Sequence, residues 1–270
     1  MINKTGTIVL LILLSTAQIF SGDSLKVHKP GMWDDLLYDT KVFISDGAAF
    51  YSAPFRLNSK EWLYTGAGML GLGLIVSQDK NLHSSLSKGV KEGDIWSIVK
   101  YGGDVKYAGI GSGAIYLTGL LSRNKDIRET GRMLLQSLVY SGIITVLFKT
   151  VTGRSRPYFS ESQYDFNWFE NAEEKQSFPS GHATVAFAVS TVFAERINTW
   201  WSRTLFYSLA AFTAYSRIHD NQHWVSDVAF GSLIGFGSGY FVVHANNNRK
   251  DKSKFSFTPT INGFCAKYVF

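Results

Sequence analysis

Six apolar segments, spaced along most of the chain, constrain its fold more than any other feature of the sequence. They cover residues 62–78, 107–122, 133–148, 183–194, 204–216 and 228–243. Each is longer than the roughly 4 to 8 residues of an ordinary buried strand, whereas helices accommodate apolar runs of this length. The sequence therefore predicts an all-α fold with a six-helix bundle as its core. Residues 255–270 alternate in polarity, which predicts a short β-hairpin in the C-terminal tail.

The N-terminus has the features of a secretion signal. Lys4 provides a positive charge, residues 8–14 form a short apolar run, and residues 15–17 are small enough for cleavage. We therefore expect residues 1–22 to be a signal peptide and the protein to be exported to the periplasm or cell envelope. The alternative is an uncleaved anchor, because residues 18–20 prolong the apolar run.

The rest of the chain divides into three parts. We expect residues 23–60 to form an N-terminal amphipathic segment, residues 61–245 the helical core, and residues 246–270 a polar tail. We find no internal repeat and no low-complexity segment in any of them.

Three local patterns are explained by structure rather than by ligand binding. Asp34, Asp35 and Asp39 are typical of a solvated helix face, which we favour over a metal site. The segment Gly66–Gly71 spells a dinucleotide-binding pattern, but no strand precedes it, so close helix packing explains it better. His83 has no partner at metal-ligand spacing and is predicted to lie at a surface or interface.

The sequence leaves open whether the six segments span a bilayer. Runs of this length rise only about 18 to 26 Å, against a hydrocarbon core of about 30 Å. The basic residues that follow the second and sixth segments favour the cytoplasmic side. A cleaved signal would instead deliver residues 23–60 outside and reverse that orientation. A bundle that is wholly exported, in the periplasm or on a membrane surface, removes this conflict, while an integral protein with its site facing the periplasm remains the alternative.

The net charge and the cysteine content limit the kinds of partner that the protein can bind. The formal charge is +6 and the pI is about 9.2, but no Lys/Arg block of the kind that tracks nucleic acid is present. We therefore expect no nucleic-acid partner, and a phosphate-bearing substrate or an anionic membrane surface fits better. Cys265 is the only cysteine, which excludes an intrachain disulfide and a thiolate metal cluster.

Three polar clusters fall at the ends of the predicted helices. They are Lys149 with Arg156-Pro157, then Pro179-Ser180-Gly181-His182, and finally Ser216-Arg217 with His223 and Asp227. The first closes the third helix, the second opens the fourth, and the last follows the fifth and opens the sixth. In a bundle whose helices alternate in direction, all these ends face the same side, so the clusters can converge.

The residue types suit the transfer of a phosphoryl group, which depends on positioning and on fixed positive charge. Three cations are available, with arginines for bidentate contacts and a lysine as a point charge. The backbone at Ser180 and Gly181 can bind an anion from a helix N-terminus. The candidate phosphate-binding residues are Lys149, Arg156, Ser180, Gly181 and Arg217.

Two histidines can divide the acid and base work, because one must be neutral to attack phosphorus while another protonates the leaving oxygen. The candidates are His223 and His182. Asp227 lies four residues after His223, within one helical turn, so its carboxylate can accept the second imidazole N–H and fix the tautomer.

Taken together, the three clusters resemble the signature shared by type 2 phosphatidic acid phosphatases, bacterial class A acid phosphatases and vanadium haloperoxidases. All 11 signature positions hold the expected residue at the expected spacing. The resemblance implies a phosphatase with His223 as the nucleophile of a phosphohistidine, His182 as general acid and Asp227 as the residue that orients His223. It also implies a helical bundle of that type, no metal or other cofactor, and inhibition by vanadate.

The substrate implied is a phosphomonoester or pyrophosphate, with a phosphorylated membrane lipid or isoprenoid favoured. A soluble periplasmic acid phosphatase acting on small phosphoesters is the next alternative. A haloperoxidase that uses vanadate as its cofactor is a third, disfavoured because those enzymes resemble much longer chains. An inactive envelope or membrane protein is a fourth, and the intact signature counts against it.

Overall fold

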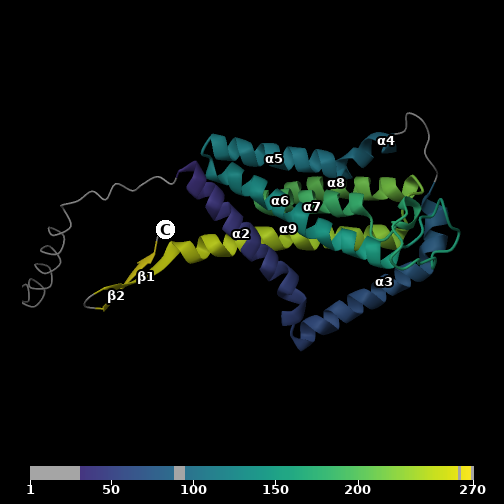
Figure 1. Ribbon diagram of the computed structural model, residues 1–270, viewed down its shortest axis with the longest axis horizontal. Coiled ribbons are helices and arrows are strands. Elements are labelled where there is room, and N and C mark those ends of the chain that lie inside the picture. The colour runs from purple at the N-terminus through teal and green to yellow at the C-terminus, as the bar shows by residue number, and fades with distance from the viewer. Residues whose placement is uncertain (1–30, 88–94, 261–262, 269–270) are drawn as a thin grey trace, which may run out of the picture.

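The computed structural model describes residues 31–87, 95–260 and 263–268, and this part of the chain is almost entirely helical (Figure 1). The helices are α2 (Met32–Ser52), α3 (Ser59–Leu86), α4 (Trp96–Val99), α5 (Val105–Leu121), α6 (Lys125–Thr152), α7 (Gly181–Ile197), α8 (Trp200–His219) and α9 (Val225–Lys254). Short 3-10 turns are η1 (Ala53–Arg56), η2 (Lys100–Gly103) and η3 (Glu173–Lys175), and strands β1 (Phe255–Thr260) and β2 (Gly263–Tyr268) pair in an antiparallel manner.

The six predicted apolar segments lie in α3, α5, α6, α7, α8 and α9, and only Ser122, the C-cap of α5, falls outside its helix, so the all-α prediction is confirmed. The predicted signal peptide, residues 1–22, lies outside the described residues.

Polar caps set the helix ends that matter for the site. Ser180 precedes α7, and its hydroxyl accepts a hydrogen bond from the Ala183 N–H. Asp104 caps α5 by accepting from the Lys106 N–H. Gly153 ends α6 with a φ of 51°, a left-handed conformation that glycine adopts without strain. These caps fix where the chain leaves α6 and enters α7.

Helix α7 is the centre of the bundle and packs against α6, α8 and α9. Glycines on α9 let the two backbones approach closely. A Cβ built at Gly231 would lie 2.5 Å from the Ser180 carbonyl oxygen, and one at Gly235 would lie 2.2 Å from the Thr184 carbonyl oxygen. Any side chain at these positions would therefore displace the start of α7, where two of the signature residues lie.

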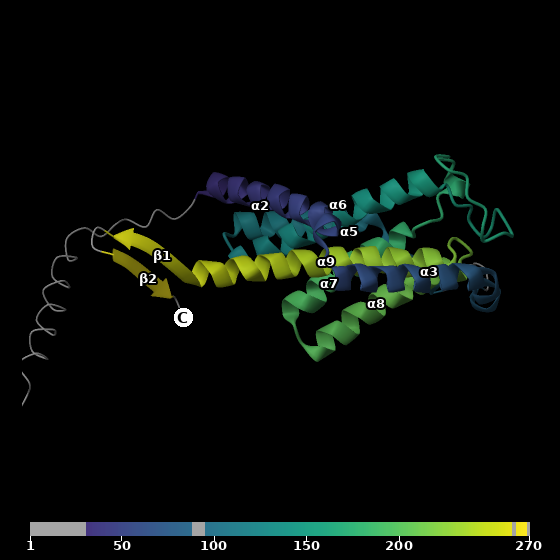
Figure 2. The same ribbon diagram turned by 90° about the horizontal axis from the view of Figure 1, so that it is seen from below.

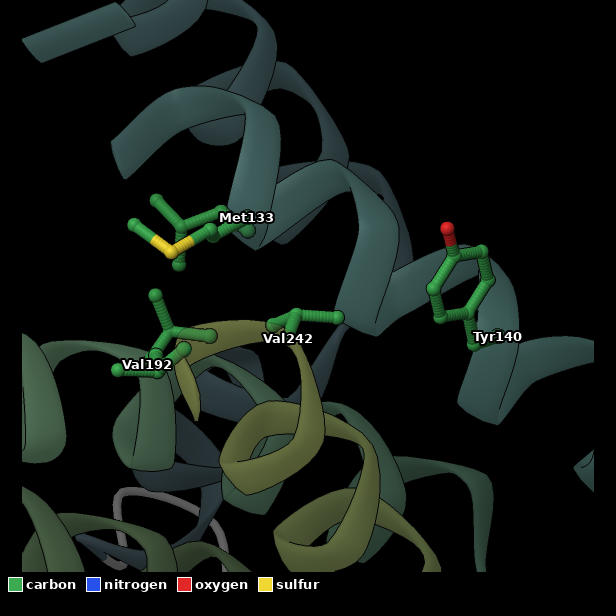
Figure 3. Packing of buried hydrophobic residues seen from close by; sticks show 6 residues of the cluster. Met133, Tyr140, Val192 and Val242 are labelled. Carbon is green, nitrogen blue, oxygen red and sulfur yellow. The ribbon is translucent and has the colours of Figure 1, made fainter. Parts of the chain in front are cut away.

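The apolar core joins α6, α7 and α9. Met133 and Tyr140 of α6 lie beside Val192 of α7 and Val242 of α9, and all four are buried (Figure 3). Burial of such side chains contributes roughly 1.5 to 3 kcal/mol each. This core holds the three helices in fixed register and so sets the relative positions of their ends.

Helix α2 is held against the bundle by buried ion pairs. The Arg128 guanidinium binds Asp35 and lies 3.1 Å from Asp39, and Arg132 lies 3.5 Å from the same Asp39 carboxylate. Asp39 is buried, so the prediction of a solvated face is wrong for this residue. The two arginines, one turn apart on α6, supply a tertiary partner that local spacing cannot reveal.

The first half of α3 packs against no other element. Trp62, Leu63 and Leu70 are largely exposed, and no atom lies within 4 Å of a Cβ built at Gly66 or Gly68. The predicted close packing at Gly66–Gly71 is therefore wrong, because α3 diverges from the bundle there (Figure 1). Two helices of the described chain, α6 and α9 as far as Lys250, are long and apolar enough to cross a membrane.

Candidate active site

The three signature clusters lie at one end of the bundle. In both views the loop from α6 to α7 and the turn from α8 to α9 lie together, next to the end of α3 (Figures 1 and 2). Direct contacts link the clusters. The Ser180 N–H donates to the Asp227 carbonyl oxygen at 3.0 Å, and Arg156 Nη1 donates to Gln222 Oε1 at 2.7 Å. The His223 N–H donates to the Arg217 carbonyl oxygen at 3.2 Å. The predicted site residues are thus brought together.

His223 is buried, with 2% of its surface exposed. Its Nδ1 lies 2.8 Å from the carbonyl oxygen of Ser177 and 3.7 Å from Asp227 Oδ2. Because a carbonyl oxygen can only accept, Nδ1 must carry the proton, which leaves the lone pair on Nε2. Burial lowers the pKa of His223 to about 3, although the neighbouring Asp227 acts in the opposite direction. The imidazole is therefore neutral and has the tautomer that a nucleophile at Nε2 requires.

Asp227 fixes His223 indirectly. We predicted that its carboxylate accepts the imidazole N–H, but that bond goes to Ser177. The carboxylate instead accepts from the Ser177 hydroxyl at 2.5 Å and from the Trp224 N–H at 2.8 Å. Asp227 therefore holds both the residue that binds the ring and the residue that follows His223 in the chain.

The three predicted cations differ in how many of their N–H donors have a hydrogen-bond partner. Lys149 Nζ donates to the carbonyl oxygen of Gln176. Arg217 lies 3.6 Å from Asp220 and is 7% exposed. The Nε atoms of Arg156 and Arg217 are buried and have no hydrogen-bond partner among the described residues. Unused guanidinium donors of this kind are suited to an oxyanion.

The start of α7 completes the site. As the first two residues of the helix, Gly181 and His182 have backbone N–H groups with no acceptor inside it, which favours an anion at this point. A Cβ at Gly181 would lie 4.0 Å from Lys149 Cε, so the lysine stem passes beside this helix end. Burial, with the positive charge of Arg217 adding to it, lowers the pKa of His182 to about 4.

A cavity of 350 Å³ opens beside His182, between α5, α6 and α7. Its lining includes Gly181, Thr145, Val146, Val185 and Asp104. Apart from Asp104 and Lys106 at the start of α5, none of its lining residues carries a formal charge if His182 is neutral. The space beside His182 is therefore largely uncharged.

The fold places several residues near His223 that the sequence does not mark as functional. Arg154 is fully buried and binds both Asp227 and Asp79. Its only sequence signal is that it lies two residues before Arg156. His83, predicted at a surface or interface, is buried and lies 2.5 Å from Asn221 through Nε2. Nothing in the local sequence marks Asp79 or His83, because their partners lie more than 70 residues away.

In the residues that the structure describes, no group of three or more His, Cys, Asp or Glu side chains is arranged to hold a metal ion. The charge that a phosphate needs is available from Lys149, Arg156 and Arg217 instead.

Comparisons with known proteins match the same part of the chain. Residues 131–251 match the family model described as PAP2 superfamily. The "Lipid A 1-phosphatase" of Rhizobium etli is 31% identical over 107 residues, which cover 39% of this chain and 45% of the relative. The "Lipid A 4'-phosphatase" of Porphyromonas gingivalis is 29% identical over 118 residues, which cover 42% and 48% respectively. The chain thus spans less than half the length of each of these relatives.

A solved structure shares the fold. It is the transmembrane PAP2 type phosphatidylglycerolphosphate phosphatase of Bacillus subtilis, with a TM-score of 0.53 and 16% sequence identity. The likeness covers 78% of this chain and 96% of that one. The family match contains every signature residue from Lys149 to Asp227. Residues 131–251 of this protein are therefore similar to the PAP2 superfamily in sequence.

Proposed function

We propose that this protein is a phosphatase that hydrolyses a phosphomonoester or pyrophosphate of a membrane lipid or isoprenoid through a phosphohistidine at His223. One observation carries the proposal: a neutral, buried imidazole lies at the same end of the bundle as three cations and a second histidine. Transfer of a phosphoryl group needs this combination of nucleophile, fixed positive charge and proton donor.

The reaction follows from these groups in two steps. Nε2 of His223 forms a bond to phosphorus as the bond to the leaving oxygen breaks, and His182 gives its proton to that oxygen. Water then attacks the phosphohistidine, His182 takes a proton from the water, and inorganic phosphate leaves with Nε2 restored. Lys149, Arg156 and Arg217 balance the charge on the phosphoryl oxygens in both steps.

His182 must gain a proton for the first step, although its pKa in the phosphate-free site is about 4. The negative charge of a bound phosphate offsets the cations around it and raises this pKa. Protonation of the general acid is therefore coupled to substrate binding.

A lipid substrate is supported by the surroundings of His182. The leaving group lies on the His182 side of phosphorus, and the cavity there is lined mainly by uncharged residues such as Val146 and Val185. Two relatives are named for the removal of phosphate from lipid A. The exposed apolar side chains of α5 and α6, Ile110 and Val146 among them, suit contact with a bilayer.

A substrate panel tests the function. Purified protein in detergent micelles should release phosphate from lipid A, phosphatidic acid, phosphatidylglycerophosphate or undecaprenyl pyrophosphate with a higher kcat/KM than from nitrophenyl phosphate. Vanadate should inhibit, and chelators should not, because the cations of the site replace a metal. Turnover of nitrophenyl phosphate alone would favour the soluble acid phosphatase, and halide oxidation dependent on vanadate would favour the haloperoxidase.

We further propose that α6 and α9 cross the membrane with the active site at the periplasmic end. Basic residues gather at the other end, with Arg128 early in α6 and Arg249 and Lys250 late in α9. Such residues favour the cytoplasm. Helix α2 is ion-paired to Arg128 at that same end, so this orientation places the paired part of α2 on the cytoplasmic side.

The single cysteine offers a test of this orientation. Cys265 follows α9, so a membrane-impermeant maleimide should leave it unlabelled in intact cells and label it after permeabilisation. In a Cys265→Ser background, Glu161→Cys places a thiol in the loop at the site end, where the Glu161 side chain is 97% exposed. That thiol should be labelled in intact cells. Labelling of Cys265 in intact cells, or release of the protein by alkaline extraction, would contradict the orientation.

The role of His182 predicts a dependence on the leaving group. His182→Gln should lose about 10² to 10⁴ in kcat on alkyl phosphates, the usual contribution of general acid catalysis. The loss should be much smaller on nitrophenyl phosphate, because nitrophenolate leaves without a proton. Initial rates over a series of aryl and alkyl phosphates measure this slope. Equal losses on all of them would count against His182 as the acid.

The pKa of His223 predicts the protonation state of its imidazole over the pH range in which the protein works. Because burial lowers that pKa to about 3, the neutral form is present above this pH and is lost only as the pH falls through it. ¹⁵N NMR of histidine-labelled protein at pH 5 should show the signal of a neutral imidazole protonated at Nδ1, and this signal should be missing from the His223→Ala spectrum. An imidazolium signal for His223 at pH 5 would contradict this assignment.

A further inference from the structure

We infer that Asp79 and Arg154 are positioning residues for the proposed phosphatase reaction, and that they hold the first turn of α9 so that His223 keeps its reactive orientation. The inference rests on the proposed function and names two residues outside the three signature clusters. Asp79 comes from α3, which precedes the residues that match the PAP2 superfamily model, 131–251.

Arg154 uses all of its donors inside the protein. A guanidinium has five N–H groups. Here Nη1 donates to Ser226 Oγ at 2.7 Å and to Asp227 Oδ1 at 2.6 Å, and Nη2 donates to Asp79 Oδ2 at 2.8 Å. The remaining two bonds, from Nε at 3.1 Å and Nη2 at 2.7 Å, go to the Gln163 carbonyl oxygen. Arg154 is therefore no phosphate ligand, unlike Arg156, whose buried Nε is unused among the described residues.

Aromatic rings hold the Arg154 guanidinium in place. Its central carbon lies 5.3 Å from the centroid of the Phe166 ring and 5.6 Å from that of Trp224. Both distances are within the range of a cation–π interaction. Trp224 directly follows His223, and its indole N–H donates to the Ser155 carbonyl oxygen at 2.9 Å. The chain on the C-terminal side of His223 is thus fixed to the segment that carries Arg154.

Asp79 acts on α9 from outside that helix. Its Oδ1 accepts the Ser226 N–H at 2.8 Å, and its Oδ2 accepts the Ser226 hydroxyl as well as Arg154. The N–H of a residue in the first turn of a helix has no acceptor within the helix. Asp79 therefore caps α9 in place of a local residue, immediately before Asp227.

Two further residues at the end of α3 contact the chain between α8 and α9. His83, one turn after Asp79 on the same face of the helix, has its Nε2 2.5 Å from Asn221 Oδ1. Ser87 follows the last residue of α3, and its hydroxyl donates to the carbonyl oxygen of His219, the last residue of α8, at 3.3 Å. The end of α3 thus contacts residues on both sides of His223.

The charges behind His223 also favour its chemistry. Asp79, Arg154 and Asp227 are all fully buried. Burial raises the pKa of Asp79, but the hydrogen bonds from Ser226 and Arg154 oppose that shift; with both carboxylates ionised, the three residues carry one net negative charge. When Nε2 bonds to phosphorus while Nδ1 keeps its proton, the imidazole ring becomes positive. A fixed negative charge behind the ring stabilises that state relative to free His223. Loss of the Asp79 charge should therefore slow the chemical step more than it weakens phosphate binding.

A matched pair of variants tests the inference. Asp79→Asn keeps the shape of the side chain and removes its charge. Asp39→Asn makes the same change in another buried carboxylate paired with arginines, at the other end of the bundle. We expect Asp79→Asn to lower kcat on the order of 10²-fold, the cost of a small misplacement of a reacting group. KM and the inhibition constant of vanadate should stay within about twofold, since the phosphate ligands are unchanged.

The control separates positioning from folding. Melting temperatures of both variants measure the loss of stability, and Asp39→Asn should keep the kcat of the parent protein. ¹⁵N NMR should show an altered His223 signal in Asp79→Asn only. An equal kcat in the two variants, or a rise in KM in place of the fall in kcat, would overturn the inference.

A milder pair covers the case in which Asp79→Asn does not fold. Ser226→Ala removes only the hydroxyl that joins Asp79 to Arg154, and Ser238→Ala removes another buried hydroxyl of α9. The first should lower kcat with KM unchanged, and the second should not. Turnover by the parent protein tests the proposed phosphatase function by itself, so a failure there is distinct from a failure of these comparisons.

Discussion

Replacement of His223 by alanine is expected to abolish turnover while leaving the phosphate site intact. The bond from Nε2 to phosphorus cannot form, and no other group of the site takes its place. Covalent catalysis of this kind is lost entirely with the nucleophile, so the expected fall in kcat is at least about 10⁵-fold, comparable with the removal of a nucleophile elsewhere. Lys149, Arg156 and Arg217 remain in the variant, so vanadate should still bind.

Two measurements separate this role from a structural one. Rapid acid-free quenching after mixing with ³²P-labelled substrate should trap a phosphoprotein in the parent and none in His223→Ala. His244→Ala is the matched control. His244 lies in the second half of α9, away from the site, and its Nδ1 is hydrogen-bonded to the Tyr240 carbonyl oxygen. Substantial hydrolysis by purified His223→Ala, or an unchanged phosphoprotein signal, would refute the assignment.

Replacement of Arg217 by alanine is expected to have the second largest effect. Arg217 is almost fully buried, its Nε has no partner among the described residues, and its charge lowers the pKa of His182. An arginine that stabilises a transferring phosphoryl group contributes about 10³ to 10⁵ in kcat. We therefore expect a loss in that range, together with weaker inhibition by vanadate, because the same donors bind the analogue.

The control for Arg217→Ala is the same substitution at another buried arginine. Arg128 is 8% exposed in its side chain and is ion-paired to α2 at the other end of the bundle. Arg128→Ala should lower the melting temperature but keep the kcat of the folded fraction. If both variants lose only stability, or if Arg217→Ala keeps full sensitivity to vanadate, Arg217 does not bind the phosphoryl group.

Several elements of the fold could be predicted because their information is local. The apolar runs that form α5 to α9 are longer than ordinary buried strands, which favours helices. Polar residues that cap helices, such as Asp104 and Ser180, mark where helices begin. The alternation of helix direction then brought the three signature clusters to one end without knowledge of the packing. The candidate site residues were identified from their residue types and from the resemblance of the three clusters to a family signature, and the structure brings these residues together.

Other features could not be predicted because they depend on partners distant in the chain. Asp39 is buried because Arg128 and Arg132 reach it from α6. Gly66–Gly71 has a packing pattern but no neighbouring helix, because α3 diverges from the bundle at that point. Such outcomes are decided by the relative placement of helices, which depends on the whole core.

The helices, the end of the bundle where the signature residues meet, and the residue types available for phosphoryl transfer all follow from the amino-acid sequence. How His223 is held depends on the packing of the folded chain. Spacing favoured Asp227 as the acceptor of its N–H, whereas the fold gives that bond to Ser177 and uses Asp227 to hold Ser177 and Trp224. The physical reason is that a helical spacing fixes only which residues share a face. Which atom lies within 3 Å of Nδ1 depends on how the loop before α7 packs against the start of α9.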